Sequence, residues 1–257
     1  KEQKKINFKI NFCPLGYSQN NYIANLGYCK QNKNVNYDFN ILLKSKKPNF
    51  LTQHYNTSFS FNWHNFSPIR HLSVMLKSSF MNSKISISSS FNHYTNYLYF
   101  NEFVSPVQLR DDMFYFNIVF NKTWLLNNFY FRSNFLIQKA NNELLSIPEL
   151  LLQQRIQYQY IIPNNIKILS SIDFQIFSKY YINSYFPLTE IFYLQLEEKR
   201  GMVPLMSANL EIYKDNFSIG CVLNNISMFL FEGEYLIKDY PFAPPTLQLL
   251  VKWQFLN

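Results

Sequence analysis

The sequence predicts an all-β protein: a transmembrane, antiparallel up-and-down β-barrel of about 14–16 strands, formed by a single domain over residues 1–257. Three observations predict this fold. Apolar and polar residues alternate with a period of two. The alternating segments are about 9–14 residues long, whereas strands of soluble proteins usually have 5–6. Aromatic residues make up 19% of the chain and gather near the ends of these segments.

The alternation is clear in residues 166–176, where isoleucines occupy one row and Lys167, Ser171 and Asp173 the other. No Asp, Glu, Lys or Arg lies in the apolar row of the alternating segments. In a membrane barrel the apolar row contacts lipid and the polar row faces the lumen. A soluble sandwich would show the same alternation, so the period alone does not decide between them. The segments are 6–12, 35–41, 55–63, 84–92, 113–120, 129–138, 149–162, 165–180 and 247–255.

Segment length and the position of aromatic residues favour the membrane. A tilted strand crosses a bilayer with roughly 9–11 residues, and rings near strand ends are typical of interfacial girdles. Hydrocarbon offers no water to free backbone groups, so every strand needs a partner and the sheet is expected to close. No apolar run approaches the ~20 residues of a membrane-spanning helix. The aromatic pairs are Tyr55 and Trp63, Phe91 and Tyr94, Tyr180 and Tyr181, and Trp253 and Phe255.

Turns are expected where Pro, Asn and Gly interrupt the alternation, for example at Asn127-Asn128, 163–165 and Asp215-Asn216. Residues 144–151 are interpreted as strand rather than as a short helix. The sequence opens inside an expected strand, so we expect the chain to be part of a larger barrel.

Two regions resemble a known family. Residues 239–245 (DYPFAPP) lead into a final strand that ends in W-x-F, and Pro148-Glu149-Leu150 precedes FSKYY at 177–181, Phe186-Pro187 and YLQ at 193–195. With NYLYFNE at 96–102 and PVQ at 106–108, these segments resemble the "putative porin" family of Bacteroidota over residues 95–257. The first 90 residues match only by alternation. Asp239 stands where family members often have glycine, and glycine-rich loops are depleted. The resemblance implies an outer-membrane barrel of a bacterial cell.

The last strand also resembles the general signal for barrel assembly, because apolar residues alternate and an aromatic stands near the end. The resemblance implies that the barrel-assembly machinery pairs with this strand by β-augmentation. Leu256 and Asn257 extend past the aromatic, which departs from the strict signal. The candidate residues are Leu249, Val251, Trp253 and Phe255.

Charged residues of the polar rows are the candidate pore lining. Six of the seven are cationic, which would favour anions in an open pore. The alternative is that they only solvate the lumen or bond to neighbouring strands. The candidates are Lys84, Arg132, Arg155, Lys167, Asp173, Lys179 and Lys252.

Catalytic, metal and cofactor sites are not expected. The three cysteines and four histidines show no ligand spacing. Asp111-Asp112 cannot act jointly on a strand, because adjacent side chains point to opposite faces, and Glu197–Arg200 is interpreted as a solvated loop. Nucleic acid is excluded as a partner, because basic and aromatic residues fall on opposite faces.

The favoured function is passive diffusion of small solutes through a porin embedded in outer-membrane lipid. A non-conducting scaffold or export barrel that works through partner proteins is the alternative. The carboxy-terminal part of a TonB-dependent receptor would need about 22 strands and a plug, and an enzymatic barrel lacks a catalytic motif. The sequence leaves open whether the chain forms a homo-oligomer.

Overall fold

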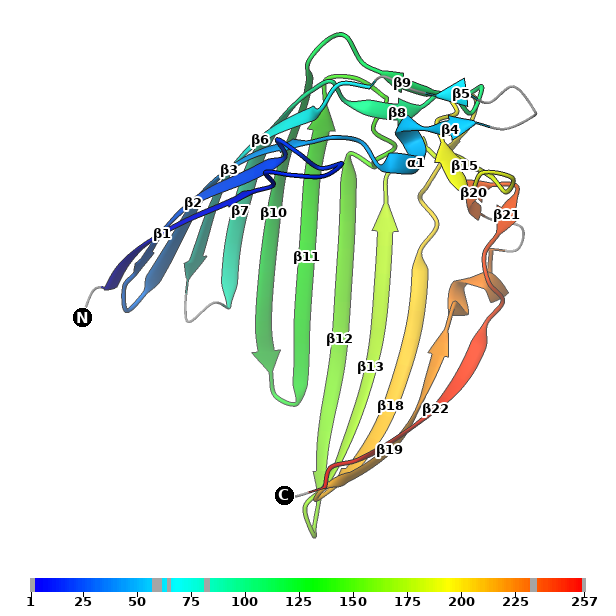
Figure 1. Cartoon of the computed structure of the whole chain (residues 1–257). Coiled ribbons are helices and arrows are strands. Elements are labelled where there is room, and N and C mark those ends of the chain that lie inside the picture. Colours follow the sequence, from blue (N-terminus) through cyan, green and yellow to red (C-terminus); the bar gives the residue numbers. More distant parts are fainter. Residues whose placement is uncertain (1–2, 57–61, 64–65, 81–83, 232–234, 256–257) are drawn as a thin grey trace.

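Twelve long strands pair in a single antiparallel sheet, and each lies beside its neighbour in chain order (Figure 1). The structure is a computed structural model and describes residues 3–56, 62–63, 66–80, 84–231 and 235–255. The strands are β1 (Gln3–Phe12), β2 (Tyr22–Gln31), β3 (Val35–Lys46), β6 (Ile69–Phe80), β7 (Ile85–Thr95), β10 (Met113–Leu126), β11 (Phe129–Ala140), β12 (Leu150–Ile162), β13 (Ile166–Phe177), β18 (Leu205–Lys214), β19 (Phe217–Asn224) and β22 (Thr246–Trp253).

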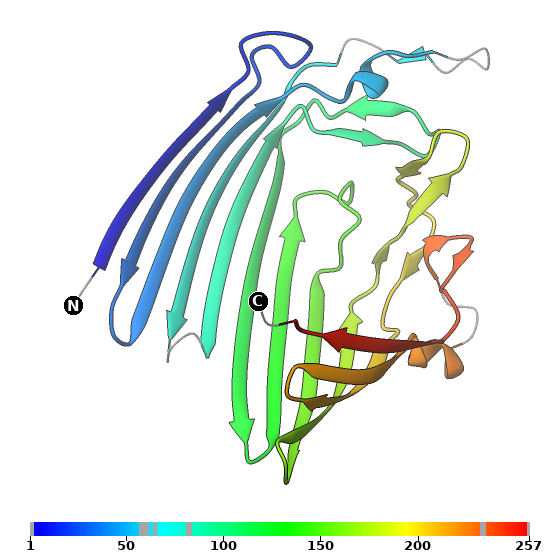
Figure 2. The same ribbon diagram turned by 60° about the horizontal axis from the view of Figure 1, so that its bottom comes forward.

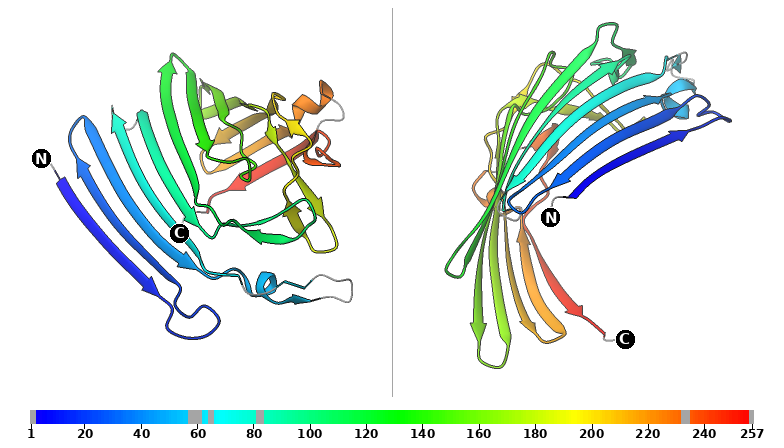
Figure 3. Two further views of the ribbon diagram at one scale, coloured as in Figure 1. Left: turned by 90° about the horizontal axis from the view of Figure 1, so that it is seen from above. Right: turned by 90° about the vertical axis from the view of Figure 1, so that its left-hand side faces the viewer.

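The sheet curls into an open trough. Among the described residues, β1 and β22 each pair with one neighbour only, and they form the two edges of the sheet (Figures 2 and 3). The antiparallel up-and-down order is therefore confirmed, while the sheet formed by the described strands is not closed. Among the described residues, no helix has the length and hydrophobicity needed to span a bilayer.

The sheet has fewer strands than the expected 14–16, and segment 55–63 accounts for part of the difference. Tyr55–Asn56 (β4) and Asn62–Trp63 (β5) pair only with each other, outside the large sheet, and residues 57–61 lie outside the described part of the chain. Alternation has the same period in a short hairpin of a loop as in a long strand of the large sheet, so the pattern did not distinguish them.

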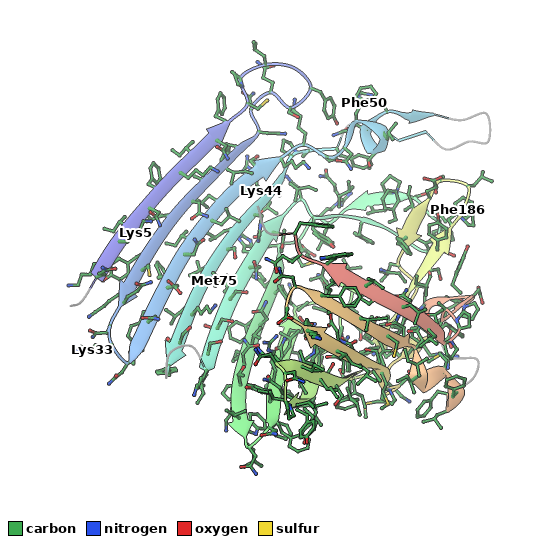
Figure 4. The ribbon with its side chains drawn as sticks, turned by 90° about the horizontal axis from the view of Figure 1, so that it is seen from below. Lys5, Lys33, Lys44, Phe50, Met75 and Phe186 are labelled. Carbon is green, nitrogen blue, oxygen red and sulfur yellow. The ribbon has the colours of Figure 1, made fainter. Side chains whose placement is uncertain are left out.

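The two ends of the trough differ in their connections. At one end the described turns are short: 32–34, 127–128, 163–165 and 215–216. The expected turns at Asn127, Asn164 and Asp215 lie here, with φ of 51°, 70° and 49°, a left-handed conformation that Asn and Asp tolerate. At the other end the connections are long: 13–21, 47–68, 96–112, 141–149, 178–204 and 225–245. We call these the turn end and the loop end. Figure 4 views the trough from below and labels Lys33 in a turn and Phe50 and Phe186 in loops.

The long connections contain short elements of their own. Residues 144–149 are neither strand nor helix, so the strand interpretation of 144–151 was right only for Leu150 and Leu151; Pro148 cannot donate a hydrogen bond to a ladder. The short elements are α1 (Phe50–Gln53), β8 (Leu98–Phe100), β9 (Pro106–Gln108), β14 (Tyr180–Tyr181), β15 (Asn183–Phe186), β16 (Ile191–Tyr193), β17 (Lys199–Arg200), the 3₁₀ turn η1 (Ile226–Phe229), β20 (Tyr235–Lys238) and β21 (Tyr240–Pro241).

The strand register keeps the polar rows of all twelve strands on one face of the sheet. For example, Lys5 faces Cys29, which faces Asp38, which faces Lys77 on β6. Exposure shows which face is enclosed: on β18, Glu211 is 4% exposed while its neighbour Leu210 is 43% exposed. We call the enclosed polar face the wall.

The apolar face is correspondingly the outer one. Its side chains stay exposed along the strands, from Phe8 on β1 at 67% to Leu249 on β22 at 81%. A soluble sheet would cover such a face with a second layer. Here it is left for lipid, as a membrane barrel requires.

The buried apolar core lies at the loop end. Met113 and Phe177 belong to the wall face of β10 and β13, and both are almost fully buried, as is Ile182 in the connection that follows. The loops therefore pack onto the wall at this end. The buried apolar residues are Val104, Met113, Phe177, Ile182, Leu194 and Val203.

Candidate functional site: the polar wall

A row of amide side chains crosses the wall between β10 and β13. Asn121, Asn134, Gln153 and Gln175 face one another in register on four neighbouring strands. Asn134 Nδ2 donates to Gln153 Oε1 at 3.0 Å, and Gln153 Nε2 donates to Gln175 Oε1 at 2.8 Å. We call these four residues the amide row. Hydrogen bonds join Asn134, Gln153 and Gln175 in a chain, whereas Asn121 donates to Ser86 Oγ at 3.3 Å instead.

A charged row lies next to the amide row, two residues further along each strand. Arg132 faces Arg155, which in turn faces Asp173. Arg155 makes a bidentate contact with Asp173, with Nε–Oδ1 at 2.5 Å and Nη2–Oδ2 at 2.8 Å. Arg132 has no ion-pair partner among the described residues. The row therefore carries one neutralised guanidinium and one free guanidinium side by side.

A cavity of about 530 Å³ lies over these two rows. Its lining comes mainly from β11, β12, β13 and the start of β18, with Asn224 and Asn225 at the end of β19. The volume is in the range of sites that hold small molecules. The cavity joins Arg132, Arg155 and Asp173 to the amide row in a single polar surface.

Two further predicted residues lie on the wall. Lys252 on β22 contacts Glu211 on β18, with Nζ–Oε1 at 2.9 Å. Lys167 lies opposite Tyr213 near the turn end and has no ion-pair partner in the described part of the chain.

The remaining two predicted cations lie beyond strand ends. Lys84 directly precedes β7, and its carbonyl accepts a hydrogen bond from the Thr123 amide at 2.7 Å. Lys179 follows β13 and lines a second cavity of about 410 Å³ at the loop end, beside Tyr180 and Lys199. The structure thus brings Arg132, Arg155 and Asp173 together and leaves the other four residues apart from them.

The sequence reasoning missed Glu211, which is the most buried carboxylate of the wall. It accepts hydrogen bonds from Ser218 Oγ and from Lys252 Nζ, both at 2.9 Å. Its place in the polar row of β18 was a usable signal, because Asn209 and Tyr213 share that row. No signal in the sequence showed that Glu211 is buried, because its burial depends on Lys252, which is 41 residues away in the chain.

Several cations of the first three strands and of β6 also belong to the wall. They occupy the same polar rows that the sequence shows, but they were not singled out. Asp38 faces Lys77 there. The additional cations are Lys5, Lys9, Lys44, Lys46 and Lys77, and Figure 4 labels Lys5, Lys44 and the wall residue Met75.

The six long connections form a continuous layer at the loop end. Tyr17 donates to the Pro48 carbonyl at 2.8 Å, and Gln108 exchanges two hydrogen bonds with the backbone of Ser67, joining three connections in turn. The Leu194 amide donates to the Phe100 carbonyl at 2.8 Å, which joins 96–112 to 178–204. We call these connections together the loop layer.

The second half of the loop layer is joined by strand pairing and charge. β15 pairs in parallel with β20, so connections 178–204 and 225–245 share a small sheet. Ser146 donates to Asn183 at 2.6 Å, which adds connection 141–149.

A charged cluster reinforces the contact between 178–204 and 225–245. Tyr235 Oη lies 2.8 Å from both carboxylate oxygens of Glu198, and Arg200 lies 2.5 Å from one of them. The hydrogen bond from Tyr235 and the Arg200 guanidinium lower the pKa of Glu198. Lys238 contacts Glu197 at 2.5 Å, which raises the pKa of Lys238. Glu198 and Lys238 therefore carry their charges at neutral pH.

The candidate assembly residues lie on the outer face at the free edge of the sheet. Leu249, Val251 and Trp253 are exposed to 81%, 62% and 66%. Phe255 follows the strand, and its ring stacks on Trp253 with centroids 5.3 Å apart. β22 pairs with β19 on one side only among the described strands.

The histidines and cysteines form no centre in the described part of the chain. His93 lies 3.0 Å from Asp112, and His71 shares a hydrogen bond of 3.0 Å with Asn92. The three cysteines are free thiols. No three His, Cys, Asp or Glu residues among those described gather into a group that could hold a metal ion.

Comparison with known protein families agrees with a barrel wall of this kind. The model of the family described as "Putative porin" matches residues 1–257. The chain belongs to this family. The match includes the first 90 residues, where the sequence segments showed only alternation. Together with the fold, membership in the porin family places the chain in the bacterial outer membrane.

A solved structure supports the fold of this porin-family chain. The FrpB iron transporter from Neisseria meningitidis (F3-3 variant) matches with a TM-score of 0.58 and 10% sequence identity. The match covers 91% of this chain and 39% of the transporter, so the chain spans well under half the length of that barrel protein. No curated protein sequence matches the chain.

Proposed function

We propose that this porin-family chain forms the wall of a water-filled outer-membrane channel that small solutes cross by passive diffusion. The observation that carries the proposal is the division of all twelve strands into one polar and one apolar face. The enclosed face holds amides, hydroxyls and charges, whereas the outer face holds side chains such as Ile172 and Leu210. A lumen of this chemistry retains water, and no catalytic step is part of the proposal.

The charges of the wall favour anions. Arg132 and Lys167 have no carboxylate partner among the described residues, while the carboxylates Asp173 and Glu211 are each neutralised by a cation. Unpaired cations in a lumen lower the energy of entering anions. Arg132 and Lys167 therefore act as a selectivity lining rather than only as solvation of the lumen.

Conductance in planar bilayers tests the proposal. The purified protein is expected to show stable unit conductance and, in a potassium chloride gradient, a reversal potential that indicates chloride preference. Replacing Arg132 and Lys167 together with Gln should shift that potential towards zero. Lys139→Gln is the matched control, because Lys139 is a cation of the outer face at a strand end. Absence of conductance would contradict the channel, and an unchanged reversal potential would contradict the lining.

The loop layer supports a second candidate, a non-conducting scaffold or export barrel. It buries the wall residues Met113 and Phe177, so it covers part of the mouth at the loop end. If the layer seals the lumen, the same bilayer experiment gives no conductance. Co-purification of a partner protein with the silent barrel would then support the scaffold.

We further propose that β22 is the strand with which the barrel-assembly machinery pairs. Its free edge and its exposed outer row support this role, because β-augmentation needs unpaired backbone groups. Replacing both Trp253 and Phe255 with Ala should slow insertion into vesicles that contain the machinery. Insertion into vesicles without the machinery is the control, and equal slowing there would indicate only loss of the interfacial rings.

A further inference from the structure

The facing arginines of the charged row are an unusual pair for a β-sheet. Arg132 on β11 and Arg155 on β12 are direct cross-strand partners on the wall. Directly opposed side chains have Cβ atoms about 4.5–5.5 Å apart, and like charges in such positions are destabilising. Asp173 relieves the repulsion for Arg155 alone, because both of its oxygens bind that guanidinium. The uncompensated charge of Arg132 thus lies beside the cavity, where it would stabilise a bound anion.

The amide row supplies the second half of a binding surface. Asn134 lies two residues from Arg132 on the same face, and Gln153 lies two residues from Arg155. Oδ1 of Asn134 is shielded and accepts no hydrogen bond from the described residues. Buried acceptors without a partner are rare in folded proteins. The row beside Arg132 therefore has hydrogen-bonding capacity that its own members leave unused.

We propose that this part of the wall is a binding site for small hydroxycarboxylates, and the inference rests on the proposed function because it names the solute of the same channel. The carboxylate binds the free fork of Arg132, whose planar donors match two carboxylate oxygens. Hydroxyl groups of the same solute exchange hydrogen bonds with the amides of Gln153 and Gln175, which line the cavity. The cavity of about 530 Å³ accommodates a solute of sugar size.

The surrounding charges select among solutes. A neutral polyol lacks the anion that Arg132 requires, and a simple carboxylate lacks donors for the amide row. The site therefore prefers a solute that carries both groups.

Equilibrium dialysis of labelled gluconate against the purified protein in detergent micelles tests the site without any channel activity. Wild-type protein should bind gluconate more tightly than acetate and should not retain sorbitol. Arg132→Gln should weaken gluconate binding roughly ten- to a hundredfold, the range expected for losing a charged hydrogen-bonding partner. Arg132→Lys should fall between wild type and Arg132→Gln, because it keeps the charge and loses the fork.

Lys167→Gln is the matched control, since it removes an unpaired wall cation away from the cavity, and it should change gluconate affinity less than twofold. Equal losses in Lys167→Gln and Arg132→Gln would show a general positive potential and overturn the site. Unchanged binding in Arg132→Gln, checked for native folding by heat-induced gel shift, would overturn it as well.

The test separates this inference from the proposed function. Gluconate binding in a protein without bilayer conductance would leave the site standing and remove the channel. Conductance without gluconate binding would do the reverse.

Discussion

Glu211 on β18 and Lys252 on β22 form an ion pair of 2.9 Å that crosses the intervening strand β19 on the wall. The two partners differ in exposure: the Glu211 side chain is 5% exposed and that of Lys252 is 58% exposed. Ser218 on β19 donates to the same carboxylate, so three strands meet at a single side chain. The ion pair therefore stabilises the position of the edge strand β22 against β19 and β18.

Replacing Lys252 with Met should lower the free energy of unfolding by about 1–3 kcal/mol, because it leaves an enclosed carboxylate with one fewer donor. Urea unfolding in lipid vesicles measures the change. Lys167→Met removes an unpaired wall lysine and should cost less than about 0.5 kcal/mol. Equal effects of the two variants would show that the ion pair does not stabilise the edge.

Two glycines of the wall are expected to differ in their tolerance of a side chain. A Cβ at Gly220 would lie 2.5 Å from the backbone carbonyl oxygen of Leu210, whereas the nearest atom to a Cβ at Gly27 would be Asn40 Nδ2 at 3.5 Å, an ordinary contact. Gly220→Ala should therefore lower the free energy of unfolding by about 1–3 kcal/mol, as overpacking does. Gly27→Ala should leave it nearly unchanged. Urea unfolding in lipid vesicles measures both variants. An unchanged free energy of unfolding in Gly220→Ala would show that β18 and β19 can move apart at this point without loss of stability.

The assignment of the two faces predicts opposite outcomes for neighbouring residues of β13. Ile172 lies on the outer face and is 50% exposed, while Ser171 lies on the wall. Arg at position 172 would lie in hydrocarbon, which costs about 2–4 kcal/mol near the midplane of a bilayer. Ile172→Arg should reduce the folded fraction in vesicles, and Ser171→Arg should not. A reversed order would show that the apolar face does not contact lipid.

The Glu198 cluster predicts a pH-dependent contact within the loop layer. Because Tyr235 and Arg200 lower the pKa of Glu198, the contact is stabilised above the ordinary glutamate pKa, about 4.3, and weakens as the pH falls through the lower folded value. Amide hydrogen exchange of residues 235–241, corrected for intrinsic rates, should therefore accelerate in acid.

Glu198→Gln is the variant that checks the cause. Its exchange over residues 235–241 should be faster at neutral pH and nearly independent of pH. Glu149→Gln, which alters a solvent-exposed ion pair with Lys139 at 3.5 Å, should behave as wild type. If wild-type exchange does not change between neutral and acidic pH, the Glu198 cluster does not hold the two connections together.

The alternation of polar and apolar residues predicted which residues of the site face away from lipid. The row that contains Arg132, Asn134 and Gln138 was predicted to face away from lipid, and the register confirms a single polar face through all twelve strands. Alternation did not predict the register, that is, which residue of a neighbouring strand lies opposite each residue. That Arg132 faces Arg155 and Arg155 faces Asp173 follows from the offsets of three strands, which turn lengths and packing set together.

The sequence by itself determined the all-β class and the two faces of the long strands, because a period of two is a local property of each strand. Only the tertiary structure decided that β1 and β22 each pair on one side only among the described strands, that six connections join into a loop layer, and that Glu211 is enclosed. These features depend on contacts between residues far apart in the chain, such as Phe100 with Leu194. Contacts of that kind are set by how the strands curve and stagger in space, which no short stretch of sequence specifies.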